Sequence, residues 1–259
     1  MSKKLLMLCS ALLMIVVMAV AGCGGQDKAK SDAKVLRVGT EATYAPFEFQ
    51  DDKSKEYIGF DMDLIRAVGK QMGYEVQIQN LSFDGLIPAL EAGNIDIAAS
   101  GMTITEERAK KILFSEPYYK AGISVMVKEG NNDIKSFNDL AGKSVAVQIG
   151  TVSAEAASKI PNAKVREFNN SSEVYLELGI GGVDAAINDL PVSAYYLQQN
   201  PNCGNKILPE IRSVESYGFA MSKKDTELKA KVDAALAELK KNGEYEKIYM
   251  KWFKQKPQA

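Results

Sequence analysis

The repeated alternation of short apolar segments with amphipathic ones is the feature that most constrains the fold of this chain. Short runs rich in Val, Ile and Ala have the length and composition of buried β-strands, and the segments between them carry apolar residues at helical spacing. Strands are expected at residues 35–39, 74–79, 95–99, 144–147, 165–168 and 185–187. Helices are expected at residues 61–72, with Asp61 as N-cap, and at 83–92, 151–160 and 172–178. Such βα alternation predicts an α/β fold with parallel sheets covered by helices.

A short internal similarity indicates two such units. Residues 87–99 read IPALEAGNIDIAA and residues 176–187 read LELGIGGVDAAI, so Asp96 and Asp184 each enter a buried strand after a helix end and a glycine. Two α/β lobes facing each other make a cleft. Because ligands of open α/β sheets bind beyond the carboxyl ends of the strands, the cleft is the expected ligand site.

Composition narrows the function classes. The 259 residues carry 32 Lys and Arg against 33 Asp and Glu, without the basic excess that nucleic-acid binding usually leaves. The chain has no histidine, which excludes Ser-His-Asp triads, Cys-His pairs and HExxH zinc sites. We expect no metal and no cofactor. We also expect ligand affinity to change little between about pH 6 and 8, where few unperturbed groups titrate.

The N-terminus has the pattern of an export signal. Lys3 and Lys4 precede an apolar run, residues 5–22, that ends in small residues before Cys23. This resembles the bacterial lipobox, in which the cysteine is acylated; a plain membrane anchor is the alternative. Residues 1–22 are then a lipoprotein signal peptide and 23–34 a flexible tether without bulky apolar residues. Cys203 is left without a cysteine partner, so no intrachain disulfide is expected.

Six motifs in series carry a family resemblance. They are GTEATYAPFEF at 39–49, GFDMDL at 59–64, FDGLIPAL at 83–90, GMTITEER at 101–108, FSEPYY at 114–119, and GEY at 243–245 with KWF at 251–253. With these motifs the chain resembles the extracellular amino-acid-binding proteins of ABC importers. The resemblance implies a type II periplasmic-binding-protein fold. Its first lobe comprises residues 35–122 and 219–259, its second lobe residues 123–218, and two crossings form the hinge.

The chemistry of a free amino acid indicates which residues hold its charged groups. Arg108 offers a planar fork that matches a carboxylate, and the resemblance gives it that role, with Thr103 as a further donor. Residues 150–152, including Thr151 and Val152, begin a helix whose free N–H groups suit the same anion. A helix cap is the plainer interpretation of that segment.

The remaining expected contacts are with the ammonium group and the side chain. Asp189, after a buried strand, is the expected partner of the ammonium group, aided by the carbonyl of Ser100 or Gly101; the N-cap of the next helix is the alternative role for Asp189. The resemblance makes Tyr44 and Phe83 aromatic walls around the aliphatic part of the ligand.

Two positions bear on specificity. Glu41 adds a carboxylate near the expected side-chain end, and Gln148 stands where glutamine-binding relatives carry a lysine that would repel a cation. The sequence therefore favours arginine or lysine as ligand, with glutamine or another neutral polar amino acid as the alternative.

The resulting expectation is a monomeric binding protein, not an enzyme, on the outer face of the bacterial cytoplasmic membrane. Lobe closure captures an amino acid and delivers it to a membrane permease. A sensor ectodomain and an enzyme resembling arogenate or prephenate dehydratase are the two alternatives from other classes.

Overall fold

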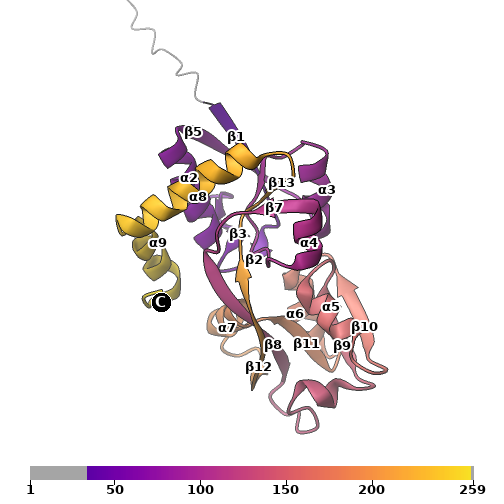
Figure 1. Cartoon of the computed structure of the whole chain (residues 1–259). Coiled ribbons are helices and arrows are strands. Elements are labelled where there is room, and N and C mark those ends of the chain that lie inside the picture. Colours follow the sequence, from indigo (N-terminus) through magenta and orange to yellow (C-terminus); the bar gives the residue numbers. More distant parts are fainter. Residues whose placement is uncertain (1–33, 258–259) are drawn as a thin grey trace, which may run out of the picture. The chain divides into compact units, whose positions relative to one another are not determined.

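The computed structural model describes residues 34–257, which form two α/β lobes, each built on a five-stranded sheet (Figure 1). The predicted signal peptide, Cys23 and most of the predicted tether lie outside the described residues. None of the helices in residues 34–257 combines the length and apolar character needed to cross a membrane.

The sheet of the first lobe has the strand order β5-β1-β6-β13-β7. Its strands are β1 (Lys34–Thr40), β5 (Tyr74–Asn80), β6 (Ile97–Ala98), β7 (Ile112–Phe114) and β13 (Ala220–Ser222). Its helices are α2 (Phe60–Met72), the 3-10 turn η1 (Phe83–Gly85), α3 (Leu86–Glu91) and α4 (Glu106–Lys111). A small antiparallel sheet of β2 (Thr43–Tyr44), β3 (Glu48–Gln50) and β4 (Tyr57–Ile58) lies between β1 and α2 in the chain.

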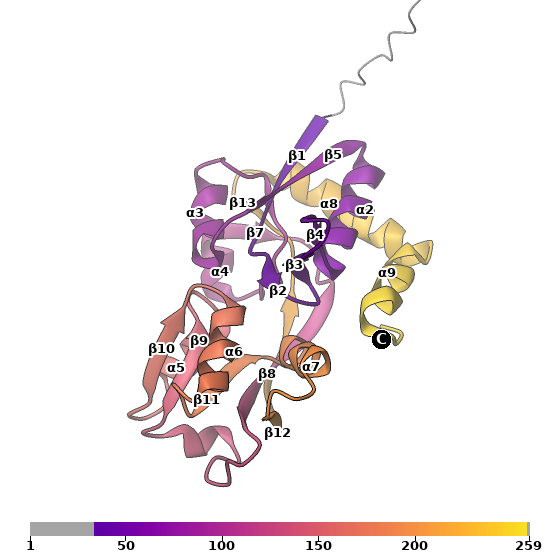
Figure 2. The same cartoon turned by 180° about the vertical axis from the view of Figure 1, so that it is seen from behind.

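The sheet of the second lobe has the order β10-β9-β11-β8-β12. Its strands are β8 (Tyr119–Lys128), β9 (Ser144–Gln148), β10 (Lys164–Phe168), β11 (Ala185–Asp189) and β12 (Asn205–Tyr217). Its helices are η2 (Phe137–Leu140), α5 (Val152–Ser158), α6 (Ser171–Ile180) and α7 (Leu190–Gln199). Figure 2, the view from behind, shows α5 and α6 beside β9 and β10, and α7 beside β8.

The two sheets are mixed, which corrects the expectation of parallel sheets. β1 pairs in parallel with β5 and β6, and β9 with β10 and β11, as the βα alternation predicts. However, β13 is antiparallel to both of its neighbours, and so is β8. The physical reason is that the chain leaves the first lobe and later returns to it. Strands on the outward and the return path must run in opposite directions.

The outward and return paths are the paired strands β8 and β12, which extend from the first lobe into the second (Figure 1). Tyr119 is the register partner of Tyr217 at one end, and Lys128 that of Asn205 at the other. Gly122 permits the close approach of the two strands, because a Cβ there would lie 2.5 Å from Cγ2 of Ile211.

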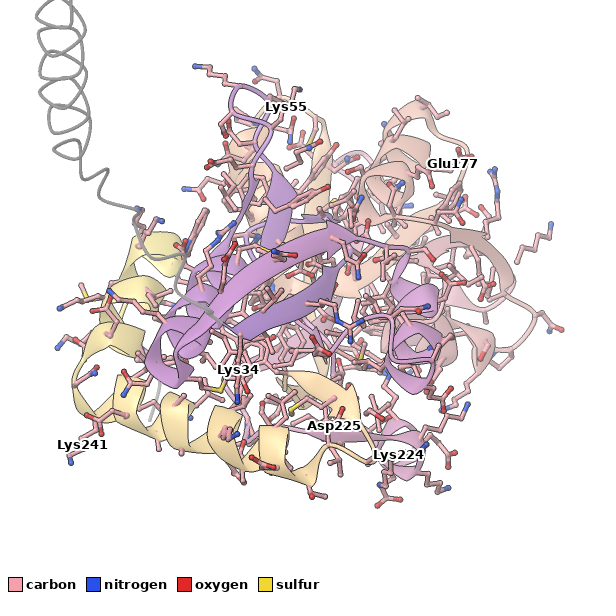
Figure 3. All side chains as sticks on the ribbon, turned by 90° about the horizontal axis from the view of Figure 1, so that it is seen from above. Lys34, Lys55, Glu177, Lys224, Asp225 and Lys241 are labelled. Carbon is pink, nitrogen blue, oxygen red and sulfur yellow. The ribbon has the colours of Figure 1, made fainter. Side chains whose placement is uncertain are left out.

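After the return, two helices complete the first lobe. α8 (Thr226–Lys241) buries one apolar stripe, and α9 (Glu244–Phe253) follows after Gly243, whose φ of 82° ends α8. Figure 3 shows Asp225 and Lys241 at opposite ends of α8. Acidic and basic charges in these places complement the helix dipole.

The two aspartates of the internal similarity have equivalent roles. Asp96 accepts the backbone N–H of Arg37 in β1 at 2.8 Å, and Asp184 accepts that of Ser144 in β9 at 2.8 Å. Each carboxylate, on the residue just before one strand, thus binds a backbone N–H of the parallel neighbouring strand. The repeated sequence pattern therefore corresponds to the same hydrogen bond between neighbouring strands in each lobe.

Asp61 is not the N-cap of α2, contrary to the sequence-based expectation. Gly59 occupies the N-cap position, and a Cβ there would lie 2.0 Å from the carbonyl oxygen of Phe47. Asp61 lies in the first turn and is fully buried, where its carboxylate accepts the N–H of Gly101. Because the backbone of Phe47 and Glu48 comes so close, only glycine fits at the cap. The Asp61 side chain instead makes its hydrogen bond to Gly101, far away in the sequence.

Candidate ligand-binding site

A narrow cavity lies between the two lobes, at the carboxyl ends of β1, β6, β9 and β11. All eleven residues that the sequence predicted to bind ligand line this cavity. The full lining is Glu41, Tyr44, Glu48, Phe83, Ser100, Gly101, Thr103, Arg108, Gln148, Thr151, Val152, Ser153 and Asp189. Sequence reasoning missed only Glu48 and Ser153 in this lining.

Arg108 is the positive group of the cavity. It belongs to α4 and is 7% exposed, with its guanidinium 5.4 Å from the ring centre of Phe83. It donates to the backbone carbonyl of Thr103 at 2.8 Å and to that of Gly150, in the other lobe, at 2.9 Å. Burial lowers the pKa of the guanidinium, which nonetheless remains charged. Both acceptors are neutral carbonyls, so the cation can still be paired by an anion in the cavity.

The start of α5 provides backbone donors in the second lobe. The Thr151 hydroxyl donates to the carbonyl of Gln148 at 2.7 Å and accepts the N–H of Ala154 at 3.2 Å. This hydroxyl therefore caps the helix, as the plainer interpretation held. The first N–H groups of a helix have no acceptor within the helix, which leaves those at Thr151 and Val152 for other partners.

Asp189 is the last residue of β11 and is 5% exposed. Its Oδ2 accepts the hydroxyl of Tyr44 from the first lobe at 2.8 Å, and also that of Tyr217. Burial raises the pKa of this carboxyl, while the two tyrosine hydroxyls oppose the rise. Although Asp189 precedes α7, its side chain makes no capping hydrogen bond to that helix. Its carboxylate is thus turned towards the cavity and away from the helix end.

Glu41 and Gln148 meet across the lobes at the polar end of the cavity. Nε2 of Gln148 donates to Glu41 at 3.1 Å, and the Thr43 hydroxyl donates to both carboxylate oxygens at 2.9 Å. Behind Gln148, its Oε1 accepts from Ser171 at 3.0 Å, and Ser171 accepts from Asn188 at 3.2 Å. Burial raises the pKa of Glu41. Within the described residues, none of these groups forms an ion pair.

Tyr44 and Phe83 contribute aromatic surface, and Gly101 gives one ring room. Gly101 has φ of 48°, and a Cβ there would lie 3.0 Å from the Tyr44 ring. A side chain at this position would therefore displace the ring from the cavity wall.

The two missed residues gave weak sequence signals. Glu48 lies in the PFEF segment, where polar and aromatic residues alternate as in an ordinary hairpin strand, yet its carboxylate is fully buried. Ser153 is the second residue of α5 and is 3% exposed. The one sequence signal for Glu48 was its position between Phe47 and Phe49, where an acidic residue is unusual if the strand is buried.

No group of three or more His, Cys, Asp or Glu side chains in residues 34–257 is arranged to hold a metal ion. The cavity thus combines one buried arginine, three buried carboxyl groups (Glu41 and Glu48 from one lobe, Asp189 from the other), backbone donors and aromatic walls. Such a set is suited to a small zwitterion, whose charges must be paired when water is excluded.

Comparison with known proteins identifies the class. Residues 36–255 match the family of bacterial extracellular solute-binding proteins, family 3, and the chain belongs to this family. It is 35% identical over 257 residues to the arginine-binding extracellular protein ArtP of Bacillus subtilis, covering 98% of each chain.

Two solved structures are also similar. One is an ancestral arginine-binding protein bound to arginine, with a TM-score of 0.82 and 49% identity, covering 85% of this chain and 98% of that one. The other is an ancestral arginine-binding protein bound to glutamine, with a TM-score of 0.80, 48% identity and the same coverage of both chains.

Proposed function

We propose that this chain is the substrate-binding component of an ABC-type importer and captures a free L-amino acid with a cationic side chain, arginine or lysine. The observation that carries the proposal is the charge pattern of the cavity, in which Arg108 is opposed by Asp189 and Glu41. An arginine or lysine ligand has one anionic group and two cationic ones, so it complements this pattern group by group. The relative ArtP is described as arginine-binding, which agrees with this choice.

The ligand's α-carboxylate is assigned to Arg108. A guanidinium binds a carboxylate through two parallel N–H donors, and Thr103 and the N–H groups at the start of α5 add donors from both lobes. The α-ammonium group is assigned to Asp189, with the carbonyl of Ser100 or Gly101 as a further acceptor.

The side chain is assigned to the space between Tyr44 and Phe83, with its cationic end at Glu41. A buried carboxylate without a cationic partner is costly, and a ligand guanidinium or ammonium would supply that partner. Glutamine is the second candidate, because the Gln148 amide can bond to another amide and because one similar structure is bound to glutamine.

Capture is proposed to proceed by lobe closure. Four contacts cross between the lobes around the cavity: Gln148 to Glu41, Arg108 to Gly150, Tyr44 to Asp189, and Ser171 to Thr43. A ligand held by both lobes adds to these contacts only in the closed state, which shifts the equilibrium towards closure. We place the lobes at residues 35–122 with 219–259 and at 123–218, with β8 and β12 as the hinge.

The location and partners follow from the N-terminal sequence and from the family. We propose that Cys23 carries a lipid that holds the chain as a monomer on the outer face of the cytoplasmic membrane, where it meets the permease. The variant Cys23→Ser is expected in the soluble fraction after cell lysis. Its retention in membranes would contradict the lipid anchor.

Binding, and not catalysis, is proposed for the cavity. A dehydratase needs an acid at the leaving hydroxyl, but the carboxyl groups of Asp189 and Glu41 already accept hydrogen bonds from Tyr44, Tyr217, Thr43 and Gln148. Recovery of the bound amino acid unchanged after prolonged incubation checks this; formation of a new product would contradict it.

A thermal-shift screen of ligand-stripped residues 26–259 against the free amino acids tests the function. A ligand at about 1,000 times its dissociation constant stabilises by about 4 kcal/mol, which raises the melting temperature of a chain of this size by about 8–16 °C. We expect arginine or lysine to give this shift, and Glu41→Gln to reduce it more for them than for glutamine. A shift with glutamine alone would overturn the ligand assignment, and no shift with any amino acid would overturn the function.

A further inference from the structure

A tyrosine at the end of a hinge strand reaches the ammonium site without lining the cavity. Tyr217 is the last residue of β12 and is fully buried. Its hydroxyl donates to Oδ2 of Asp189, the carboxylate assigned above to the ligand's ammonium group. Because Tyr217 is not part of the cavity lining, its hydroxyl can affect a ligand only through Asp189.

The ring of Tyr217 is held by the first lobe. It packs against Phe47 at a distance of 5.2 Å between ring centres, and it is stacked on Tyr119 at 5.7 Å. The backbone beside it is also tied to that lobe, because the N–H of Gly218 donates to the carbonyl of Met102 at 3.1 Å. A side chain enclosed by close packing has little freedom to move. The packing of the first lobe therefore sets the position of this hydroxyl.

Two hydroxyl groups meet on one oxygen of Asp189. Tyr44 donates to the same Oδ2 at 2.8 Å. A carboxylate oxygen accepts about two hydrogen bonds, so two donors leave Oδ2 without a further acceptor site. Oδ1 makes no hydrogen bond within residues 34–257. The carboxylate is therefore oriented with one oxygen fully used and the other available for an ammonium group.

The two tyrosines differ in what else they do. The ring of Tyr44 lines the cavity, whereas the hydroxyl of Tyr217 makes a single hydrogen bond within residues 34–257, the one to Asp189. Arg108 and Glu215 are the charged groups that face Asp189. In the same part of the chain, Arg108 donates to backbone carbonyls and not to this carboxylate. The orientation of the carboxylate thus depends on the hydroxyl groups.

We propose that Tyr217 is a positioning residue for ammonium binding, which fixes Oδ2 of Asp189 so that Oδ1 faces the α-ammonium group of the ligand. This role rests on the proposed function for the identity of the ligand group, while the contact between Tyr217 and Asp189 does not. Hydrogen bonds from hydroxyl groups also favour the ionised carboxylate, the form that pairs with an ammonium ion. Since arginine, lysine and glutamine all have this group, Tyr217 acts on the affinity for each of them and not on the choice among side chains.

Isothermal titration calorimetry with L-arginine compares Tyr217→Phe with wild type. Phenylalanine keeps the ring with its contacts and removes only the hydroxyl, so the variant is expected to fold, which circular dichroism checks. Loss of one donor lets the carboxylate turn, and we expect arginine affinity to fall by about tenfold or more. Tyr245→Phe is the matched control, because it removes another buried hydroxyl, one that donates to the backbone carbonyl of Tyr118. The affinity of this control is expected to equal that of wild type.

A second ligand distinguishes positioning from a general effect on the fold. δ-Guanidinovalerate is arginine without the α-ammonium group, and its affinity is measured by its competition with L-arginine. If Tyr217 acts through Asp189, Tyr217→Phe lowers the affinity for arginine but leaves that for δ-guanidinovalerate unchanged. L-Lysine, which keeps the ammonium group, should lose affinity by the same factor as arginine. An equal loss for δ-guanidinovalerate, or an unchanged arginine affinity in the folded variant, would overturn the proposal.

A titration without ligand separates this inference from the proposed function. The carboxyl carbon-13 resonance of Asp189, identified by its absence in Asp189→Asn, reports the pKa of this group. Removal of a donor to the ionised form raises that pKa, so it should be higher in Tyr217→Phe than in wild type or Tyr245→Phe. Equal pKa values in all three would overturn the proposal, also where δ-guanidinovalerate does not compete. If no amino acid binds to wild type, the proposed function fails, while the titration still decides whether Tyr217 holds Asp189.

Discussion

At the scale of the residue, Arg108 is the proposed partner of the ligand's carboxylate; it is the arginine of the cavity lining and it contacts both lobes. Arg108→Ala leaves a buried ligand carboxylate without its partner, a loss of about 3–5 kcal/mol. We therefore expect arginine affinity, measured by calorimetry, to fall at least about 100-fold. The arginine affinity of Arg108→Lys is expected to lie between those of wild type and Arg108→Ala, because lysine keeps the charge but lacks the planar fork.

Arg66→Ala is the matched control for this prediction. Arg66 also donates to a backbone carbonyl, that of Tyr57 at 2.7 Å, but it is not part of the cavity lining. The Arg66→Ala variant is expected to bind arginine with the affinity of wild type. Near-normal affinity in a folded Arg108→Ala variant would contradict the assignment of the carboxylate.

At the scale of the element, the strands and helices were predictable because their patterns are local. The periodicity of residues 61–72 predicted α2 to within one residue of its start. The cap of that helix was not predictable, because Gly59 is selected by the distant carbonyl of Phe47. For the same reason the directions of β8 and β13 escaped prediction: they depend on where the chain returns, which no local pattern encodes.

The candidate site was predictable to a similar extent. The eleven lining residues that the sequence predicted follow strand ends or lie in the six motifs, whereas the hydrogen bond between Gln148 and Glu41 joins positions far apart in the chain. Periodicity places a residue on an element. It does not say which group a buried carboxyl such as Glu48 will meet.

The hinge strands support a prediction at this same scale. Gly122→Ala puts a methyl group 2.5 Å from Cγ2 of Ile211, and overpacking of this kind costs about 1–3 kcal/mol. We expect a lower melting temperature in denaturation followed by circular dichroism. Ile211→Ala in the same chain should restore much of the loss, and Gly130→Ala, where a Cβ meets nothing within 4 Å, is the control. A Gly122→Ala variant with the melting temperature of wild type would show that β8 and β12 can shift to make room for the methyl group.

At the scale of the whole molecule, closure depends on few contacts. The lobes meet around the cavity through four polar contacts, while Glu41 and Asp189 place two buried carboxyl groups opposite one arginine. Carboxyl groups gathered by closure oppose it unless a cation or a proton neutralises them. A cationic amino acid supplies that charge and adds contacts to both lobes. The closed state should therefore be more populated with bound ligand than when only the four polar contacts hold the lobes together.

Small-angle X-ray scattering tests this balance. Ligand-stripped protein is expected to have a larger radius of gyration than protein saturated with arginine, because its lobes separate about β8 and β12. In Arg108→Ala, arginine at the same concentration should leave the scattering unchanged. Lowering the pH towards 5 without ligand should itself reduce the radius, since protonation of Glu41, whose pKa is raised by burial, removes part of the opposing charge. Identical curves for wild type with and without arginine would mean that the lobes stay together without ligand, and that capture requires another route into the cavity.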